Sequence, residues 1–439
     1  MALNDLADTL KERKINIVHV GQFDHAGIFR ERRLPRDSFL EWADKPRFSN
    51  TVAIWDSSDN LFGPGPYLTE DVVIDPTSLR SYPFEPDAAA IIAEFSGDSA
   101  EIMPRAVLRR QVERAAALGL EVRAAFEFEV IFLDETAESL RTAGFAGLRS
   151  FAPDNKCWGG QTGANHAGFV AGLEDTLRAT GVSVFGVSGE LGPGCFEATL
   201  AAESPLKAAD DAGFFRLATR AYARNHGKTA SFMSCLGQGY PGLGGHVSLS
   251  LWDKATGKNV FSDPKNVTNP AALSFIGGMT RTVPEAFALC AHTVNAYRRY
   301  APGSWAPKSV GWAELTFTTA VRSVPSQGGG ARLEFRLPGA DCNPYLTLAL
   351  MLGAGLDGIE EKLSAPAPTP DNGPDDIPPG AIRLPGSLAE AAARLSASEN
   401  ARRLFGERFV NHFTRACEVE HASLARAVST QEIERYLEG

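Results

Sequence analysis

The sequence predicts an α+β protein with a small N-terminal domain over residues 1–103 and a larger domain over residues 104–439. Three observations predict this fold class. Strand patterns dominate the N-terminal part, a strongly marked helix follows them, and the remainder mixes strands with long helices such as 206–226. A chain of 439 residues is also long enough for two or three domains, since about 150 residues is a typical domain size.

The first elements follow from local patterns. Residues 15–20 predict a strand, a turn is expected at Gly21, and a second strand is expected near Ile28. The helix after the strands begins at Pro104 and is stopped by Gly119, because proline suits the first turn of a helix and glycine the position past its end. We therefore place the domain boundary just before Pro104.

Two C-terminal segments differ in composition. Residues 364–387 are rich in proline and aspartate, which is typical of an exposed loop or flap rather than a core element. Residues 388–437 have apolar positions at helical spacing, and this spacing predicts a helical C-terminal region.

The composition excludes several classes of protein. A hydrophobic fraction of 44% and a charged fraction of 22% are ordinary for a globular protein and exclude wholesale disorder or a fibre. The net charge of -10 argues against nucleic acid as the main partner. Six irregularly spaced cysteines without a C-x-x-C pair indicate reduced thiols. With no signal pattern and no long apolar run, we expect a cytoplasmic protein without a membrane span.

Three predicted strands carry polar side chains on one face and apolar side chains on the other, because side chains alternate along a strand. The polar faces comprise Glu127 and Glu129; His246, Ser248 and Ser250; and Arg332, Glu334 and Arg336. In addition, Glu190 and Glu197 flank a Gly-Pro-Gly turn. Each feature alone is explained as well by a solvated sheet face, a structural histidine or a surface ion pair.

Together these features predict a site for divalent cations. Crowded carboxylates repel one another and need cations to stay charged. An oxygen-rich set with a single imidazole suits Mg²⁺ or Mn²⁺ rather than zinc, and such ions beside arginines bind phosphate and carboxylate groups. The candidate ligands are Glu127, Glu129, Glu190, Glu197, His246 and Glu334.

At these residues the chain resembles the glutamine synthetase superfamily, and within it the branch of γ-glutamyl-amine ligases, such as γ-glutamylanilide-type enzymes. The resemblance implies a β-grasp-like N-terminal domain and a catalytic domain built on a curved antiparallel sheet. The segments that resemble the family motifs, in chain order, are Phe126–Glu129, Ser188–Glu197, Phe232–Leu236, Gly242–Ser248, Val294–Arg299, Pro302–Pro307, Arg332–Arg336 and Asn343–Leu346.

The resemblance also implies roles for individual residues and two to three Mg²⁺ or Mn²⁺ ions per subunit. One ion would be held by Glu129, Glu190 and Glu197, and another, against the ATP phosphates, by Glu127, His246 and Glu334. Glutamate would be bound by Arg299, Arg336 and the backbone of Gly242, and the nucleotide side would be formed by Ser250, Arg322 and Arg332. The catalytic groups would be Arg322 and Asp56, the latter supplied by a neighbouring subunit in a homo-oligomeric ring, a decamer or a dodecamer.

Some positions depart from the family pattern. The family's flap glutamate falls at Trp305, and an arginine of the phosphate side falls at Phe317. Cys235, Ser248 and Cys195 stand where the family has lysine, histidine and glutamine. An indole can neither accept the proton of ammonium nor attract it as a carboxylate does. Trp305 can instead line an apolar amine pocket, so the departures indicate an apolar or aromatic amine.

The function expected from the resemblance is ATP-dependent ligation of the γ-carboxylate of glutamate to such an amine through a γ-glutamyl phosphate. Its partners would be small molecules: glutamate, the amine and ATP. Two alternatives stay open. One is a repurposed or inactive homologue, which the losses on the phosphate side favour. The other is a metal-dependent hydrolase of γ-glutamyl amides that uses no nucleotide.

Overall fold

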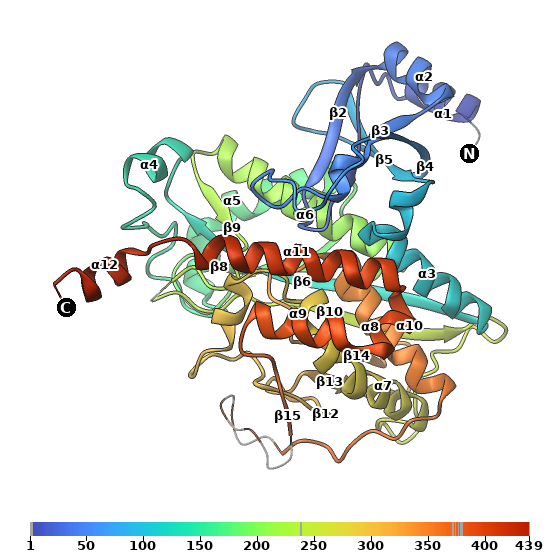
Figure 1. Cartoon of the computed structure of the whole chain (residues 1–439), viewed down its shortest axis with the longest axis vertical. Coiled ribbons are helices and arrows are strands. Elements are labelled where there is room, and N and C mark those ends of the chain that lie inside the picture. The colour runs from blue at the N-terminus through green and yellow to red at the C-terminus, as the bar shows by residue number, and fades with distance from the viewer. Residues whose placement is uncertain are drawn as a thin grey trace.

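The computed structural model describes residues 3–237, 239–370, 373, 375, 377 and 381–438. Within these ranges two mixed α/β units are stacked, a small one at the N-terminus and a larger one with a curled sheet (Figure 1). The predicted α+β class is confirmed.

The N-terminal unit is a five-stranded sheet with two helices on one face. The strand order is β2-β1-β5-β4-β3, and β1 runs parallel to β5. Alternation along β5 divides its side chains: Ala89 and Ile91 pack toward α1 and α2, while Ala90 and Ile92 pack toward the larger unit. The elements are α1 (Leu3–Glu12), β1 (Ile17–Phe23), β2 (Phe29–Pro35), α2 (Arg36–Asp44), β3 (Arg47–Ser49), β4 (Thr69–Ser81) and β5 (Ala88–Phe95).

The turn predicted at Gly21 is wrong. Strand β1 continues through Gly21 to Phe23, and the turn follows it, with Gly27 at a φ of 73°. Gly21 serves a close approach of two strands instead: a Cβ at this position would lie 2.2 Å from the carbonyl oxygen of Arg30 on β2. The two N-terminal helices α1 and α2 were also absent from the sequence prediction.

The larger unit is built on an eight-stranded sheet in the order β12-β13-β14-β10-β6-β8-β7, with β9 paired to β6. All its pairings are antiparallel except that of β12 with β13. A separate short pair joins β11 (Ser309–Val310) to β15 (Ile382–Arg383). The strands of the main sheet are β6 (Leu120–Leu133), β7 (Val184–Gly189), β8 (Cys195–Leu200), β9 (Thr229–Ser231), β10 (Gly245–Asp253), β12 (Trp312–Glu314), β13 (Val321–Val324) and β14 (Arg332–Phe335).

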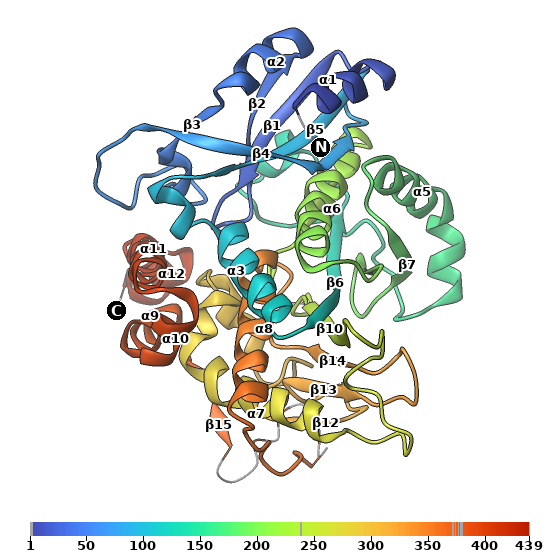
Figure 2. The same cartoon turned by 90° about the vertical axis from the view of Figure 1, so that its right-hand side faces the viewer.

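Helix α6 joins the two units, lying between the N-terminal sheet and β6 (Figure 2). Its Phe214 meets Phe23 edge to face at 5.2 Å, and its Phe215 stacks on Phe128 of β6 at 5.6 Å. The predicted helices after Pro104, over 206–226 and in the C-terminal region are confirmed. The helices of the larger unit are α3 (Pro104–Ala117), α4 (Ala137–Thr142), α5 (Gly160–Ala179), α6 (Pro205–Asn225), α7 (Pro270–Ala286), α8 (Pro344–Glu360), α9 (Leu388–Ala397), α10 (Glu399–Phe405), α11 (Glu407–Ala425) and α12 (Thr430–Tyr436).

The domain boundary before Pro104 stays a prediction, and the burial pattern favours it. Among the described residues, buried apolar side chains form two clusters, and the members of one of them all lie between Leu6 and Met103. Polar contacts cross the boundary. Arg105 of α3 pairs with Asp75 of β4 at 2.7 Å and with Asp210 of α6 at 2.8 Å. These contacts tie the N-terminal sheet to the helices beneath it.

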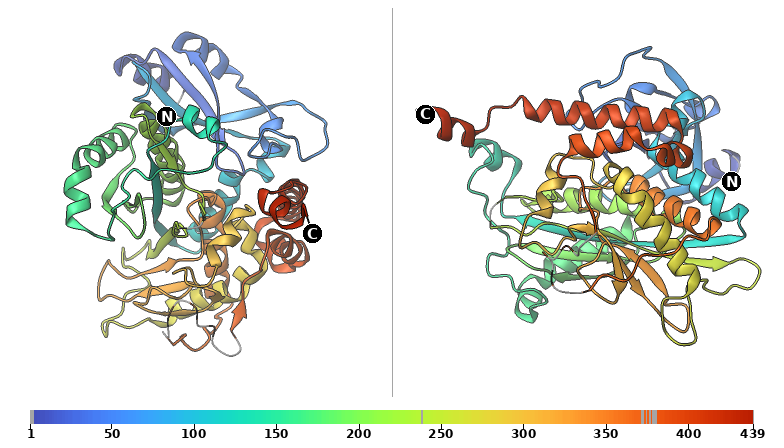
Figure 3. Two further views of the ribbon diagram at one scale, coloured as in Figure 1. Left: turned by 90° about the vertical axis from the view of Figure 1, so that its left-hand side faces the viewer. Right: turned by 60° about the horizontal axis from the view of Figure 1, so that its bottom comes forward.

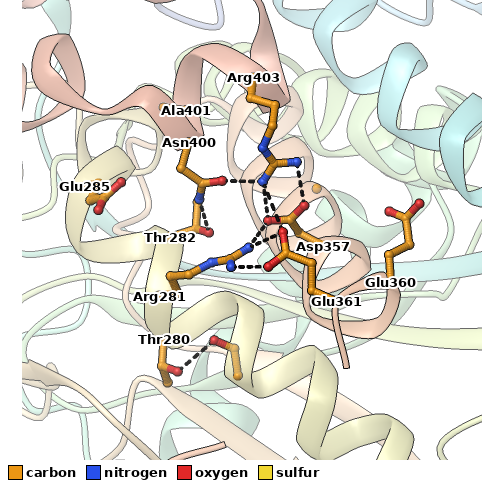
Figure 4. A network of polar contacts seen from close by, with 12 residues as sticks. Thr280, Arg281, Thr282, Glu285, Asp357, Glu360, Glu361, Asn400, Ala401 and Arg403 are labelled. Atoms are coloured by element: carbon orange, nitrogen blue, oxygen red, sulfur yellow. Dashed lines mark hydrogen bonds and ion pairs between the residues drawn. The ribbon is translucent and has the colours of Figure 1, made fainter. Parts of the chain in front are cut away.

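A second polar network connects helices α3, α7, α8 and α10 of the larger unit (Figure 4). Asp357 of α8 is 1% exposed and contacts the guanidinium groups of Arg114, Arg281 and Arg403, which belong to α3, α7 and α10. Both nitrogen–oxygen contacts with Arg403 are short, at 2.6 and 2.8 Å. One buried carboxylate on α8 therefore ties three other helices to α8.

The C-terminal region packs on the body of the molecule except at its last helix. Helix α11 packs on α9, and α12 projects outward (Figures 1 and 3). In the proline-rich segment 364–387, residues 364–370 have no helix or strand and are exposed or half-buried, as predicted, whereas Ile382 and Arg383 form the short exposed strand β15. Residues 371, 372, 374, 376 and 378–380 of that segment lie outside the described residues. In the described part of the chain, no helix is long and apolar enough to cross a membrane.

Candidate active site

Strand register brings the predicted polar residues to one face of the large sheet. His246 of β10 pairs with Glu127 of β6, and Glu129 of β6 pairs with Glu197 of β8. On the other side of β10, Glu334 of β14 lies opposite Ser248. Directly paired side chains on one face of a sheet are close neighbours. Four strands therefore place carboxylates and one imidazole side by side.

Glu127, His246 and Glu334 form the tightest group in this row. One potential ligand atom from each lies within 4.8 Å of the other two. His246 Nδ1 is 3.3 Å from Glu127 Oε1 and 3.8 Å from Glu334 Oε1. Although burial favours the protonated form, the contact with His246 lowers the pKa of Glu127. Burial likewise favours the protonated form of Glu334, but His246 and Arg336 lower its pKa.

Glu129, Glu190 and Glu197 form a looser group beside it. Glu129 Oε2 accepts a hydrogen bond from the backbone N–H of Gly244 at 2.9 Å. Burial and the negative charge of Glu127 raise the pKa of Glu197 to about 9. A cation bound beside Glu197 would stabilise its ionised form and so lower this pKa again.

The turn that carries Glu190 is fixed by a neighbouring segment. The side-chain amide of Asn155 donates to the carbonyl oxygens of Glu190 at 2.7 Å, Gly192 at 2.9 Å and Cys195 at 2.9 Å. Two residues further on, the thiol of Cys157 donates to Glu190 Oε1 at 3.1 Å. Partial burial and this hydrogen bond raise the pKa of Cys157 to about 11. Neither Asn155 nor Cys157 was a sequence candidate.

Two arginines neutralise Glu334 from the other side. Arg322 of β13 donates to Glu334 Oε2 at 3.0 Å, and Arg336 donates to Glu334 Oε1 at 2.5 Å. Phe317 lies against both: the guanidinium carbon of Arg322 is 4.4 Å from its ring centroid and that of Arg336 is 5.5 Å away. The carbonyl oxygen of Phe317 also accepts from Arg336 Nε at 3.1 Å. The aromatic residue at the family's arginine position therefore positions two arginines.

Arg299 approaches the same site from a short 3₁₀ helix (Asn295–Tyr300) and is buried. Its Nη1 donates to the carbonyl oxygen of Leu337 at 2.8 Å, and its Nη2 is 3.5 Å from His246 Nε2. A Cβ at Gly242 would lie 2.9 Å from Arg299 Cγ, so glycine allows this backbone to lie close to the arginine. The sequence-predicted glutamate-binding residues thus adjoin the cluster of carboxylates.

The donor set fits divalent cations. Five carboxyl groups and one imidazole converge from four strands and one turn, and burial together with the neighbouring carboxylates raises the pKa of Glu197. Oxygen donors with one imidazole nitrogen suit Mg²⁺ and Mn²⁺. The assignment of individual ligands to individual ions stays a prediction.

Two residues of the expected nucleotide side have other contacts. Arg332 is exposed, and its Nη1 donates to the carbonyl oxygen of Gly330 at 3.2 Å. Ser250 Oγ accepts a hydrogen bond from the indole of Trp252 at 3.0 Å. Their nucleotide-binding role is untested and stays a prediction.

Trp305 lies in a loop outside the sheet and is 56% exposed. The loop is held by Lys308, which donates to the carbonyl oxygens of Ser304 at 3.1 Å and Ala306 at 3.0 Å. The backbone N–H of Gly303 also donates to Asp375 at 2.9 Å. An exposed indole is available to a ligand, and its role as an amine-pocket wall stays a prediction.

Asp56 is buried within its own loop of the N-terminal unit. Its Oδ1 accepts from the backbone N–H groups of Ser58 at 2.8 Å and Asn60 at 2.9 Å. It borders a cavity of about 280 Å³ whose lining also includes Arg216 and Glu420 and none of the six candidate metal ligands. A contribution of Asp56 to a neighbour's site stays a prediction.

Comparison with known proteins identifies the family. The family model for the catalytic domain of glutamine synthetase matches residues 101–436. The chain belongs to the glutamine synthetase family.

Similar members of the glutamine synthetase family include ligases for organic amines. A glutamate–isopropylamine ligase from a Pseudomonas species is 31% identical, over 98% of this chain and 97% of its own length. A glutamate–methylamine ligase from Methyloversatilis universalis is 27% identical over the full length of both chains. The solved structure of GmaS without ligand superposes with a TM-score of 0.86 at 25% identity, covering 99% of this chain and 100% of GmaS.

Proposed function

We propose that this glutamine synthetase homologue is an ATP-dependent ligase that joins the γ-carboxylate of glutamate to an organic amine. The observation that carries the proposal is the row of carboxylates, His246 and arginines on one face of the sheet, in a chain similar along its whole length to amine ligases. The indole at Trp305 supports an amine larger than ammonia.

The cation sites follow from the two groups of ligands. Glu127, His246 and Glu334 would hold one divalent cation, and a second would be held by Glu129, Glu190 and Glu197. Divalent cations bound there would neutralise and orient the phosphate and carboxylate groups of the substrates.

The arginines of the site would bind and align the reacting groups. An oxygen of the γ-carboxylate attacks the γ-phosphorus of ATP, ADP leaves, and a γ-glutamyl phosphate forms. Arg299 and Arg336 would hold the carboxylates of glutamate, and Arg322 would face the transferring phosphoryl group. The amine nitrogen then attacks the acyl carbon, phosphate leaves, and the nitrogen gives up one proton.

Alkylamines and arylamines differ in whether the amine must lose a proton before it attacks. An arylamine is already uncharged at neutral pH, whereas an alkylammonium must lose a proton before its nitrogen can attack. Trp305 cannot accept a proton. In an assembled oligomer, a carboxylate remains available at Asp56 of a neighbouring copy. The names of the similar ligases give small alkylamines, so we propose that this chain also takes an alkylamine and passes its proton to this carboxylate.

The proposal includes an oligomeric ring of ten or twelve subunits. Asp56 borders a cavity separate from the six candidate ligands of its own chain, so its expected catalytic role requires a neighbour. Contacts between unlike surfaces that close on themselves produce rings. A folded, active monomer in light scattering would contradict this part of the proposal.

The function is tested by turnover of the full-length protein with ATP, glutamate, Mg²⁺ or Mn²⁺ and a panel of amines: ammonia, methylamine, isopropylamine, ethanolamine and aniline. We expect ADP and a γ-glutamyl amide in equal amounts, with an organic amine preferred to ammonia. Equal or better turnover with ammonia would contradict the amine assignment. Release of glutamate from a γ-glutamyl amide without nucleotide would support the hydrolase alternative instead.

A further inference from the structure

A cavity of about 280 Å³ is bordered by loops of the N-terminal unit and by helices α6 and α11 of the larger unit. The loops contribute residues 25–28 and 56–57, α6 contributes Arg216 and Arg220, and α11 contributes Glu420. Its lining, taken over the described residues, includes none of the six candidate metal ligands and none of the three arginines beside them. Ligand pockets usually start at about 300 Å³, so this cavity suits a ligand smaller than a nucleotide.

The two arginines of this cavity have no carboxylate partner. Arg216 is 3% exposed, and its Nη1 donates to the carbonyl oxygens of Ala340 at 3.2 Å and Cys342 at 2.8 Å. Its Nε is buried and has no hydrogen-bond partner in the described ranges. The guanidinium carbon of Arg220 lies 5.0 Å from the ring centroid of Phe232, and its side chain forms no hydrogen bond or ion pair with a described residue. Buried charges are normally paired, so these two arginines favour an anion.

The spacing of the two arginines brings their positive charges together. Residues four positions apart on a helix face the same side, and Arg216 and Arg220 have this spacing on α6. Arg220 is reached by solvent, but the surrounding protein and the charge of Arg216 lower its pKa to about 10. Burial lowers the pKa of Arg216 as well. An anion bound beside both side chains would offset their repulsion.

Two uncharged imidazoles supply further hydrogen-bonding nitrogens to the cavity. The Nδ1 atoms of His25 and His292 are buried, and neither has a hydrogen-bond partner among the residues that the structure describes. Burial lowers the pKa of His25 to about 3 and that of His292 to about 4, so both rings are neutral at pH 7. A neutral imidazole donates one hydrogen bond. Asn343 holds the His25 loop in place, since its side chain donates to the carbonyl oxygens of Asp24 and His25 at 3.0 Å each.

The carboxyl groups that border the cavity have other partners or a weakened charge. Asp341 accepts from the hydroxyl groups of Ser234 at 2.5 Å and Thr293 at 2.6 Å. Asp56 accepts from two backbone N–H groups of its own loop. Burial and the charge of Asp56 raise the pKa of Glu420, which shifts it toward the protonated form. A protonated carboxyl group also donates a hydrogen bond, so these residues leave the arginines available to a ligand.

We propose that this cavity is a second ligand site, which binds a small oxyanion through Arg216 and Arg220 with His25 and His292 as further hydrogen-bond donors. Arginine is suited to phosphate and carboxylate groups because its planar guanidinium matches their oxygens. The proposed reaction releases phosphate and consumes glutamate, so both groups are tested as sources of the oxyanion. A ligand bound here would also lie beside the loop of Asp56, which is expected to complete the site of a neighbouring copy.

The test is hydrogen exchange of the full-length protein with sodium phosphate, with sodium glutamate, and with sodium chloride at matched ionic strength. We expect phosphate or glutamate to slow exchange of the amides in residues 25–28 and 292–293, and chloride to have no such effect. Arg220→Gln should raise the ligand concentration at half protection about tenfold or more. Arg224→Gln is the matched control, because Arg224 is an exposed arginine one turn further along α6 and outside the lining of the cavity.

A second variant separates charge from packing. Arg220→Lys keeps the positive charge and should retain part of the affinity, whereas a role of Arg220 in packing against Phe232 alone would make lysine and glutamine equivalent. Circular dichroism of each variant checks its fold. Protection that is unchanged in Arg220→Gln, or equal with chloride, would overturn the proposal, as would the absence of protection with both phosphate and glutamate.

The outcomes also separate this cavity from the candidate active site. An anion bound at the active site should slow exchange around Glu334 and Arg336, and Arg336→Gln should weaken that effect without changing protection of residues 25–28. The measurement needs no turnover. A protein without ligase activity that still shows protection dependent on Arg220 would contradict the proposed function and support the second site.

Discussion

Phe317 offers the sharpest mutational test of the site, because its ring lies against Arg322 and Arg336, two arginines of the candidate site. The guanidinium carbons of Arg322 and Arg336 lie 4.4 Å and 5.5 Å from the ring centroid of Phe317, and Phe317 is 49% exposed. A cation–π contact at such a site contributes about 0.5–1 kcal/mol. Two contacts sum to about 1–2 kcal/mol, which corresponds to about a five- to thirtyfold change in an equilibrium constant. We expect Phe317→Leu to weaken substrate binding by about this factor.

The assay for Phe317 is steady-state turnover with the best amine, giving KM for glutamate and ATP and kcat for each variant. Phe317→Tyr keeps the aromatic face and should stay close to the parent protein, whereas Phe317→Leu keeps the apolar bulk and loses the face. The backbone contact to Arg336 is unaffected by either change. The reasoning is refuted if leucine matches the parent, or if tyrosine is as impaired as leucine.

Three further predictions concern stability, metal and amine choice. Asp357→Asn should lower the free energy of unfolding in urea by about 2–4 kcal/mol. This loss is smaller than for a fully buried ion pair because the arginine partners of Asp357 are partly exposed. Glu360→Gln, which changes a more exposed partner of Arg114, is the control and should have a small effect. Although burial opposes it, Arg403 lowers the pKa of Asp357. The stabilisation by Asp357 is therefore present at neutral pH and should be lost in acid, as the carboxylate is protonated below its ordinary pKa of 3.8. A free energy of unfolding that does not fall in this acid range would count against this. Glu129→Ala and Glu334→Ala should each abolish metal-dependent turnover, and retained turnover in either would remove that residue from the ligand set. Trp305→Glu should reduce use of apolar amines by about tenfold or more, and unchanged amine selectivity would leave Trp305 outside the pocket.

Much of the site could be predicted from the sequence because it depends on strand alternation. Alternation alone places Glu127 and Glu129 on one face of β6, and the family resemblance supplies the neighbouring strands. The compact group with His246 and Glu334 then follows from register. The helix after Pro104 was predictable because its start and stop residues are local features.

Other features depend on contacts between distant segments, which no local pattern reveals. Gly21 suggested a turn, yet it serves the close approach of Arg30 on the next strand. The thiol of Cys157 meets Glu190 only after the chain folds back over 33 residues. Phe317 was visible as a lost arginine, but its packing against two other arginines required the geometry.

The central claim, ligation through a γ-glutamyl phosphate, is tested most directly by an isotope transfer. Glutamate labelled with ¹⁸O in its γ-carboxylate is turned over with ATP and the preferred amine, and the released phosphate is examined by mass spectrometry. The account predicts that one ¹⁸O per turnover appears in inorganic phosphate, because the attacking carboxylate oxygen leaves with the phosphoryl group. Unlabelled phosphate, or label in AMP, would contradict it.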